Sequence, residues 1–398
     1  MQPISRTWLN VIAAVVCVLS AFIPWARWAN ARSSDFVSHY AAGEMVQQDP
    51  SHLYSLAEQR KYQTALGERK FLPWVHPAVE ALLFAALSGL GIERAFQVWE
   101  ALNIAALCWI AFSLRRYLGD LSGPQASAAF AVGLIPLGAG LAAGQDHILC
   151  LLLYCWTFLL IEDGREVLGG CVFGLAFVRF QLAIPVLIFF LVMRRWRVVA
   201  GAAVTMTVMI AASFAVVGRG LISSWQGLLS SWQGSLGSYR AAIVYLGTTH
   251  DATSLTHTPS VRGLLAFVVK DARELAVSTA VVSAVLLIAA GVMWRRAEER
   301  RFDVAFASAL LLALAVDYHS FFYEMSVVVL AAVLVVRRCP RFVVMLWVMV
   351  AAEVTLVAVG GEFALLAPLL VGAAWWAMSA AQTPQEKEKP RTVEVDRG

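Results

Sequence analysis

The 398-residue chain has few charged residues and none of the spacings that mark a disulfide framework or a metal site. Charged residues make up 15% of it and hydrophobic residues 60%, with a mean hydropathy of +0.69, which excludes an ordinary soluble domain. The net charge of +4 is small and sits in short loops, which argues against nucleic-acid binding. The six cysteines lack Cys-x-x-Cys spacing, and no Asp-x-Asp motif occurs. The sequence therefore predicts no disulfide, no metal and no cofactor.

Long apolar runs recur along the chain and predict an all-α integral membrane protein, because about 20 apolar residues cross a hydrocarbon core of about 30 Å. The twelve predicted spans are 8–26, 95–114, 124–142, 147–161, 166–178, 181–193, 197–217, 274–293, 303–317, 320–336, 341–358 and 362–380. The shorter ones indicate tilted or broken helices. Residues 1–380 are thus predicted to form one transmembrane domain, and the charged residues 381–398 a disordered cytoplasmic tail.

Arginines and histidines occupy alternate gaps between these spans. The arginine-rich gaps contain Arg115-Arg116, Arg165, Arg194-Arg195, Arg295-Arg296 and Arg337-Arg338, and the other gaps contain His39, His52, His76, His147, His250, His257 and His319. Short Lys/Arg-rich loops stay cytoplasmic. Both termini are therefore predicted to be cytoplasmic, and the histidines to face the outside of the cell (inner) membrane. The first span also has features of a signal peptide, but its long apolar run favours retention.

The apolar stretch 77–90 is predicted to be a re-entrant or interfacial helix, since a thirteenth span would place the later arginines outside. It belongs to a first outer segment, 27–94, with juxtamembrane helices, and a second outer stretch covers 218–273. Long ordered loops between membrane helices often carry function. Three tryptophans in these segments, Trp74, Trp225 and Trp232, are predicted to be interface anchors.

Residues 35–48 are predicted to form a short helix with Asp35 at its N-terminus. Asp35 and His39 then share one face, and Phe36 and Tyr40 share another. The helix macrodipole stabilises an ionised carboxylate at this position, so Asp35 is a candidate general base. The alternative is that Asp35 only caps the helix. His39 and Tyr40 are candidates for an acceptor-binding group or a second acid.

Several motifs resemble one enzyme family in their order along the chain. They are Asp35-Phe36 with Tyr40 and Ala42-Gly43, Leu53-Tyr54, Pro77 before an apolar run, Trp99, Gly144-Gln145-Asp146-His147, Gly169-Gly170 with Arg179-Phe180-Gln181, and Asp317-Tyr318-His319. The ordered set is similar to the signature of glycosyltransferase family 87, GT-C-fold membrane enzymes that use polyprenyl-phosphate sugars. The resemblance implies a GT-C-type multi-pass bundle and a hexosyltransferase, with mannose as the sugar. Arg179-Phe180 replaces Lys-Pro and His147 replaces Asn, so the positive charge is kept while the sugar-contacting positions differ.

The remaining candidate residues follow from this resemblance and from their place in the chain. Arg179 interrupts an apolar stretch and is predicted to bind the donor phosphate, or else to snorkel. His319 is predicted either to donate a hydrogen bond to the same phosphate or to be an interfacial histidine. Asp146 is predicted to be either an acid that orients the acceptor or a helix cap. Further candidates for donor or substrate binding are Gln145, His147, Gln181 and Arg240.

The sequence favours a membrane glycosyltransferase with Asp35 as its base and inversion at the sugar. Its partners would be the bilayer, a polyprenyl-phosphate sugar as co-substrate, and a glycolipid, glycan or protein acceptor. A multi-pass transporter or flippase is the main alternative, but it would place ionisable groups near the bilayer midplane and often shows repeated halves, and no repeat is evident here. A non-catalytic scaffold would not need the polar groups at the outer ends of the spans.

Overall fold

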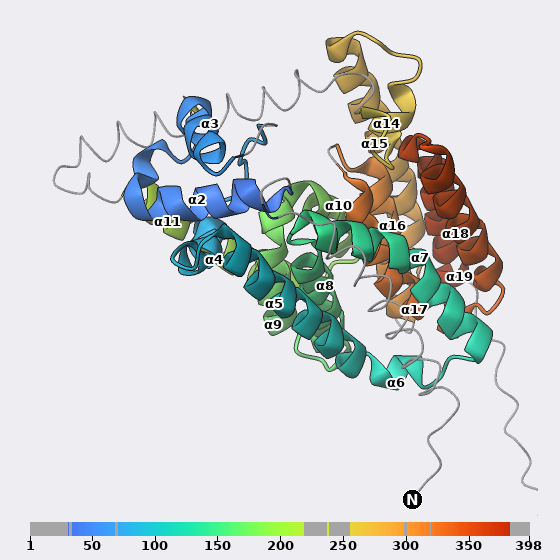
Figure 1. Ribbon diagram of the computed structural model, residues 1–398. Helices are drawn as coiled ribbons and strands as arrows, with labels where there is room; N and C mark the ends of the chain where they lie inside the picture. Colours follow the sequence, from blue (N-terminus) through green and yellow to red (C-terminus); the bar gives the residue numbers. More distant parts are fainter. Residues whose placement is uncertain are drawn as a thin grey trace, which may run out of the picture.

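The computed structural model describes residues 31, 34–67, 71–218, 237–238, 255–297, 301–318 and 320–382. Within these residues every regular element is helical, as predicted (Figure 1). The predicted first span 8–26, most of the stretch 218–273 with Arg240, and the tail beyond Gln382 lie outside the described residues, as does His319.

By length and apolar composition alone, seven described helical segments qualify as membrane spans, and one of them, Glu166–Val192, is a hairpin rather than a single helix. They are Ile92–Ser113 (α5), Gly123–Ala143 (α7), Glu166–Val192 (α9, η2 and α10), Trp196–Val217 (α11), Ala272–Trp294 (α15), Phe342–Val359 (α18) and Phe363–Gln382 (η5 and α19). Shorter helices are Ala78–Ser88 (α4), His147–Glu162 (α8), Phe302–Val316 (α16) and, after the 3-10 turn Phe322–Val327 (η4), Val328–Arg338 (α17). All of these except α4 coincide with predicted spans. The multi-pass helical class is therefore confirmed, and the count of twelve crossings stays a prediction.

The segment Glu166–Val192 folds back on itself at Arg179. α9 (Glu166–Leu175) continues into the 3-10 turn η2 (Ala176–Arg179), and α10 (Phe180–Val192) starts at the next residue. The ring centroids of Phe173 and Phe190 are 5.1 Å apart, whereas one straight helix would separate these positions by about 25 Å. α9 and α10 are therefore two arms of a hairpin, and Arg179 lies at its tip.

The first outer segment forms short helices that pack on the bundle. They are Phe36–Gln48 (α2), Pro50–His52 (η1), Leu56–Ala65 (α3) and α4. α4 has 11 residues and a length of about 16 Å, too short to cross the hydrocarbon core, which agrees with the prediction for 77–90. A Cβ atom on Gly43 of α2 would lie 2.5 Å from the carbonyl carbon of Phe84 in α4. Glycine at this position thus lets the two backbones meet.

Ion pairs join the arginine-rich loops at one end of the bundle. They link Arg116 to Asp163 (3.2 Å), Arg195 to Glu166 (2.6 Å), Arg337 to Asp120 (3.0 Å) and Arg338 to Asp303 (2.8 Å). Figure 1 shows the helix that follows α5, Arg115–Leu118 (α6), at this end, and α2 and α3 toward the opposite end. The arginine loops therefore share one end, as the charge pattern predicts.

The surface of the bundle is apolar where it would meet lipid. α15 exposes valines and an isoleucine at helical spacing, including Val277, Val281 and Ile288. In contrast, every residue of α16 is buried. α16 is thus a central helix of the core, and α15 lies at its periphery.

Candidate functional site

A tight turn between α7 and α8 brings the motif Gly144-Gln145-Asp146 against the start of α2. Gly144 has a left-handed backbone (φ 68°), and a Cβ atom there would lie 2.7 Å from Cβ of Phe36. The indole nitrogen of Trp99 donates a hydrogen bond to the carbonyl oxygen of Gly144 (3.0 Å). Glycine and tryptophan therefore place the side chains of Gln145 and Asp146 next to Asp35.

Asp35 occupies the N-cap position of α2 but does not cap it. Its side chain accepts no hydrogen bond from the helix backbone, whereas Asp271 caps α15 by accepting from two backbone N–H groups. Instead, Oδ2 of Asp35 accepts a hydrogen bond from Nε2 of Gln145 (2.8 Å), and Asp35 stays partly exposed. The helix-cap interpretation of Asp35 is therefore wrong, and its role as a base stays a prediction.

Arg179 lies at the centre of a buried charged cluster. Its Nε donates to Oδ1 of Asp146 (2.9 Å), and its Nη1 donates to Oε1 of Glu324 (3.1 Å). Nη2 also contacts Asp146 and donates to Oε1 of Gln145 (2.5 Å). The exposed fraction is 5% for Arg179, 0% for Asp146 and 3% for Glu324. Snorkelling is therefore wrong, and Arg179 is not a lone cation. A donor phosphate would have to replace one of its carboxylate partners.

Gln145 connects this cluster to Asp35. Its amide oxygen accepts from Arg179 while its amide nitrogen donates to Asp35, so both ends of the amide are fixed. Asp146 also sits at an N-cap position without capping its helix. Burial alone would raise the pKa of Asp146, but the guanidinium of Arg179 holds it below its usual range. Asp146 is thus an ionised partner of Arg179 rather than a helix cap.

Histidines and a glutamate from the first outer segment complete the cluster. Nδ1 of His76 is 2.9 Å from Oε2 of Glu80 and 3.9 Å from Oδ2 of Asp146. Trp74 is 1% exposed, stacks on the ring of His76 (centroids 4.6 Å apart) and meets the edge of His39 (5.2 Å). The prediction that Trp74 anchors the protein at the membrane interface is wrong, because Trp74 is a packing residue of this cluster.

Burial lowers the pKa of His39 to about 4 and that of His76 to about 3, so both rings are neutral near pH 7. Burial raises the pKa of Glu80 well above its usual range, and the carboxylate of Asp146 raises it further. The potential metal-ligating atoms of His39, His76 and Glu80 all lie within 4.8 Å of one another.

Three other predicted site residues, Tyr40, His147 and Gln181, lie outside the hydrogen bonds that surround Arg179. The hydroxyl of Tyr40 donates to the carbonyl oxygen of Ser88 (2.6 Å) at the far end of α4. The ring of His147 is buried beside Gly140 and 5.9 Å from that of Tyr323. Gln181 is partly exposed in the first turn of α10, and among the described residues it makes no hydrogen bond to this cluster.

Sequence reasoning missed two acidic residues, Glu80 and Glu324, as well as the role of His76. The signal was present, because each glutamate interrupts an apolar stretch, 77–90 or 320–336. An ionisable residue in such a stretch is expensive unless it is paired or functional. Glu324 pairs with Arg179, the other ionisable residue in such a stretch, and Glu80 pairs with His76.

A second buried arginine lies beside the segment that leads to residue 319. Arg262, on the short helix Val261–Leu265 (α14), donates from Nη1 to the carbonyl oxygen of Tyr318 (3.0 Å) and lies over its ring (3.8 Å). Its Nε is buried without a hydrogen-bond partner among the described residues. Arg262 therefore keeps a free donor that an anion could use.

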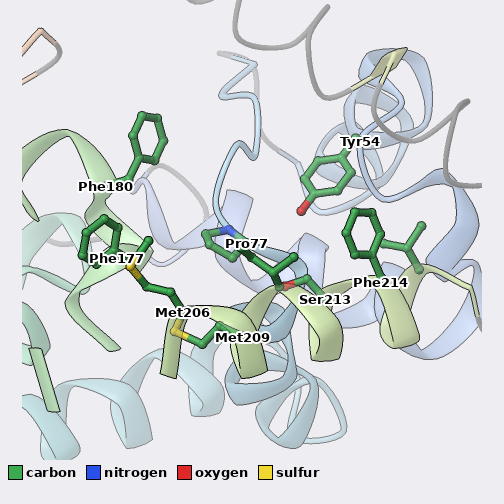
Figure 2. Close-up of a pocket in the computed structure, with 10 residues that line it drawn as sticks. Tyr54, Pro77, Phe177, Phe180, Met206, Met209, Ser213 and Phe214 are labelled. Carbon is green, nitrogen blue, oxygen red and sulfur yellow. The ribbon is translucent and has the colours of Figure 1, made fainter. Parts of the chain in front are cut away.

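An apolar pocket of about 330 Å³ adjoins the cluster. Figure 2 shows Met206, Met209 and Ser213 of α11 around Pro77, with Phe177 and Phe180 on one side. Tyr54 and Phe214 line the other side. Pro77 directly follows His76, and the two phenylalanines flank Arg179. The pocket walls therefore include the chain neighbours of His76 and Arg179.

The family model of glycosyltransferase family 87 matches residues 74–319, more than half of the chain. This range includes Gln145, Asp146 and Arg179, while Asp35 and Glu324 lie on either side of it. No curated protein and no solved structure matches the chain.

Proposed function

We propose, because the chain belongs to glycosyltransferase family 87, that it transfers a hexose, mannose in the first instance, from a polyprenyl phosphate to an acceptor hydroxyl. The acceptor oxygen would attack the anomeric carbon from the face opposite the phosphate and invert the configuration there. The bond between this carbon and the phosphate oxygen would break, and the phosphate would leave with the bonding electrons. The acceptor can be a glycolipid, a glycan or a protein.

The single observation that carries this proposal is the position of Asp35. Its carboxylate does not cap α2, is partly exposed, and is oriented through Oδ2 by Gln145. Among the described residues, no hydrogen bond to Oδ1 is made, so this oxygen can accept the proton of the acceptor hydroxyl. General-base catalysis of this kind contributes about 10²–10⁴-fold to a rate. The leaving phosphate is already a stable anion and needs no acid.

The apolar pocket supports a lipid-linked donor. Its walls are phenylalanine, methionine, isoleucine, valine, proline and tyrosine side chains with a single serine, a lining that suits a hydrocarbon chain. A polyprenyl chain placed there would bring its phosphate toward Arg179, which Phe177 and Phe180 flank. We propose that the phosphate is bound by Arg179 and Arg262. His319 and Arg240 are predicted to contribute to the same binding.

The charge distribution supports a site that faces away from the cytosol. The arginine loops meet at the end of the bundle opposite α2 and α3, and short arginine-rich loops stay cytoplasmic. We propose that both termini are cytoplasmic and that Asp35 faces the outside of the cell membrane. Nucleotide sugars are absent there, which is why the donor would be carried by a lipid.

The test uses membranes that contain the full chain and radiolabelled polyprenyl-phosphate mannose, with transfer to any acceptor as the readout. Asp35→Asn should fold normally and lose at least about 10²-fold in turnover, because an amide is not a base at neutral pH. Asp49→Asn is the matched control, since Asp49 lies at the other end of α2 and should keep its turnover. Near-normal turnover by Asp35→Asn would remove Asp35 as the base. Label that crosses the membrane without joining an acceptor would indicate a transporter instead.

A further inference from the structure

We propose that His39, His76, Glu80 and Asp146 bind one divalent transition-metal ion, with zinc as the best chemical match. The three ligating side chains of His39, His76 and Glu80 converge to within 4.8 Å of one another. Asp146 is not one of these three, but its Oδ2 lies 3.9 Å from Nδ1 of His76 and would supply a fourth ligand after a side-chain movement. Binding of the ion at this site can be measured without any sugar transfer.

Two of the four proposed ligand atoms have no hydrogen bond, whereas Nδ1 of His76 and the carboxylate of Glu80 are bonded to each other and would exchange their shared proton for the metal. Nδ1 of His39 is 3.2 Å from the carbonyl oxygen of Asp35, so this nitrogen carries the proton and Nε2 keeps its lone pair. Nε2 of His39 and Oδ2 of Asp146 are both buried, and neither has a hydrogen-bond partner among the described residues. Buried polar atoms without partners are costly. Donation from the second ring N–H to a carbonyl oxygen is also the usual way in which proteins orient a metal-binding histidine.

The types of ligand select the metal. Two imidazoles with carboxylates are typical of zinc, whereas calcium and magnesium prefer oxygen ligands alone. Zinc bonds of about 2.1 Å place tetrahedral ligand atoms roughly 3.4 Å apart, so modest side-chain movements close the site. The carboxylates of Glu80 and Asp146 together balance the two positive charges of the ion.

The nearby cation does not prevent binding. Arg179 contacts Oδ1 of Asp146, and the metal would take Oδ2 of the same carboxylate. Arg179 is further neutralised by Glu324. The ion would thereby join α2, the segment before α4, α4 itself and the turn before α8. Because His39 contacts the backbone of Asp35, the metal would also position that residue, a role that rests on the proposed function.

The experiment measures zinc binding by the purified full chain in detergent, after treatment with a chelator, by titration calorimetry and elemental analysis. His76→Phe keeps an aromatic ring stacked on Trp74, and Glu80→Gln keeps the shape of the side chain. Both variants should lose one bound equivalent or bind it at least tenfold more weakly. His52→Ala is the matched control, because the exposed His52 pairs with Asp49 at 2.8 Å outside this site. The His52→Ala variant should still bind one equivalent of zinc.

Two results would overturn the proposal. Equal zinc binding by the unaltered chain and by both variants would place the metal elsewhere. No binding by the unaltered chain would mean that His76 and Glu80 share only a proton. Zinc binding without any transfer of mannose would support the metal site while refuting the proposed function, so the two failures can be told apart.

Discussion

Replacement of Arg179 by glutamine should destabilise the protein strongly, because two buried carboxylates would lose their shared cation. Asp146 and Glu324 both contact Arg179, and their side chains are 1% and 3% exposed. Removing one partner of a buried ion pair costs about 3–5 kcal/mol, although protonation of one carboxyl group limits the loss. For a domain of this type, such a cost lowers the midpoint of thermal unfolding by roughly 6 °C or more.

The double variant Arg179→Gln with Glu324→Gln distinguishes lost charge pairing from lost packing. It removes one of the unpaired carboxylates and should recover at least about 1 kcal/mol relative to Arg179→Gln alone. Arg116→Gln serves as a control, since Arg116 and Asp163 are both 52% exposed and such pairs contribute about 0–1 kcal/mol. Tryptophan fluorescence during heating, in one detergent and lipid mixture, measures all three variants. An effect of Arg179→Gln no larger than that of Arg116→Gln would refute the reasoning, as would a double variant less stable than the single one.

Two further predictions concern the lipid pocket and the topology. Met209→Trp should fill the apolar pocket and raise the KM for the lipid donor about tenfold, equivalent to about 1.4 kcal/mol. Val204→Trp on the exposed face of the same helix should have little effect, and equal kinetics of the two variants would exclude the pocket. A cysteine introduced at the exposed Ala57 of α3 should react with an impermeant thiol reagent added outside intact cells, whereas one at the exposed Asp163 should not. The reverse pattern of labelling would invert the proposed orientation.

The positions of the membrane helices could be predicted from the sequence, because hydropathy is a property of a local run of residues. The predicted spans 124–142 and 197–217 agree within a residue or two with α7 and α11. The prediction of a short helix at 77–90 also agrees with α4, since the alternating charges of the loops constrain how many runs can cross.

The interpretation of individual polar residues was less successful, because it depended on partners far away in the chain. Arg179 and Glu324 are separated by 145 positions, and Gln145 and Asp35 by 110. No pattern within one helix shows that such residues meet. The same reasoning assigned capping to Asp35 and Asp146 as an alternative, because an aspartate at a helix start usually caps it.

The sequence by itself determined that this is a helical membrane protein, which of its loops carry the arginines, and that it resembles family 87. The class of protein and the placement of the arginines follow from the free-energy cost of placing charge or unpaired backbone groups in hydrocarbon. This cost depends on the residues of each segment alone, so it can be judged from the sequence. Only the tertiary structure decided that Asp35 is held by Gln145, that Arg179 is paired, and that His39, His76 and Glu80 converge. A buried charge needs a partner in space, and close contacts at Gly43 and Gly144 place these partners together.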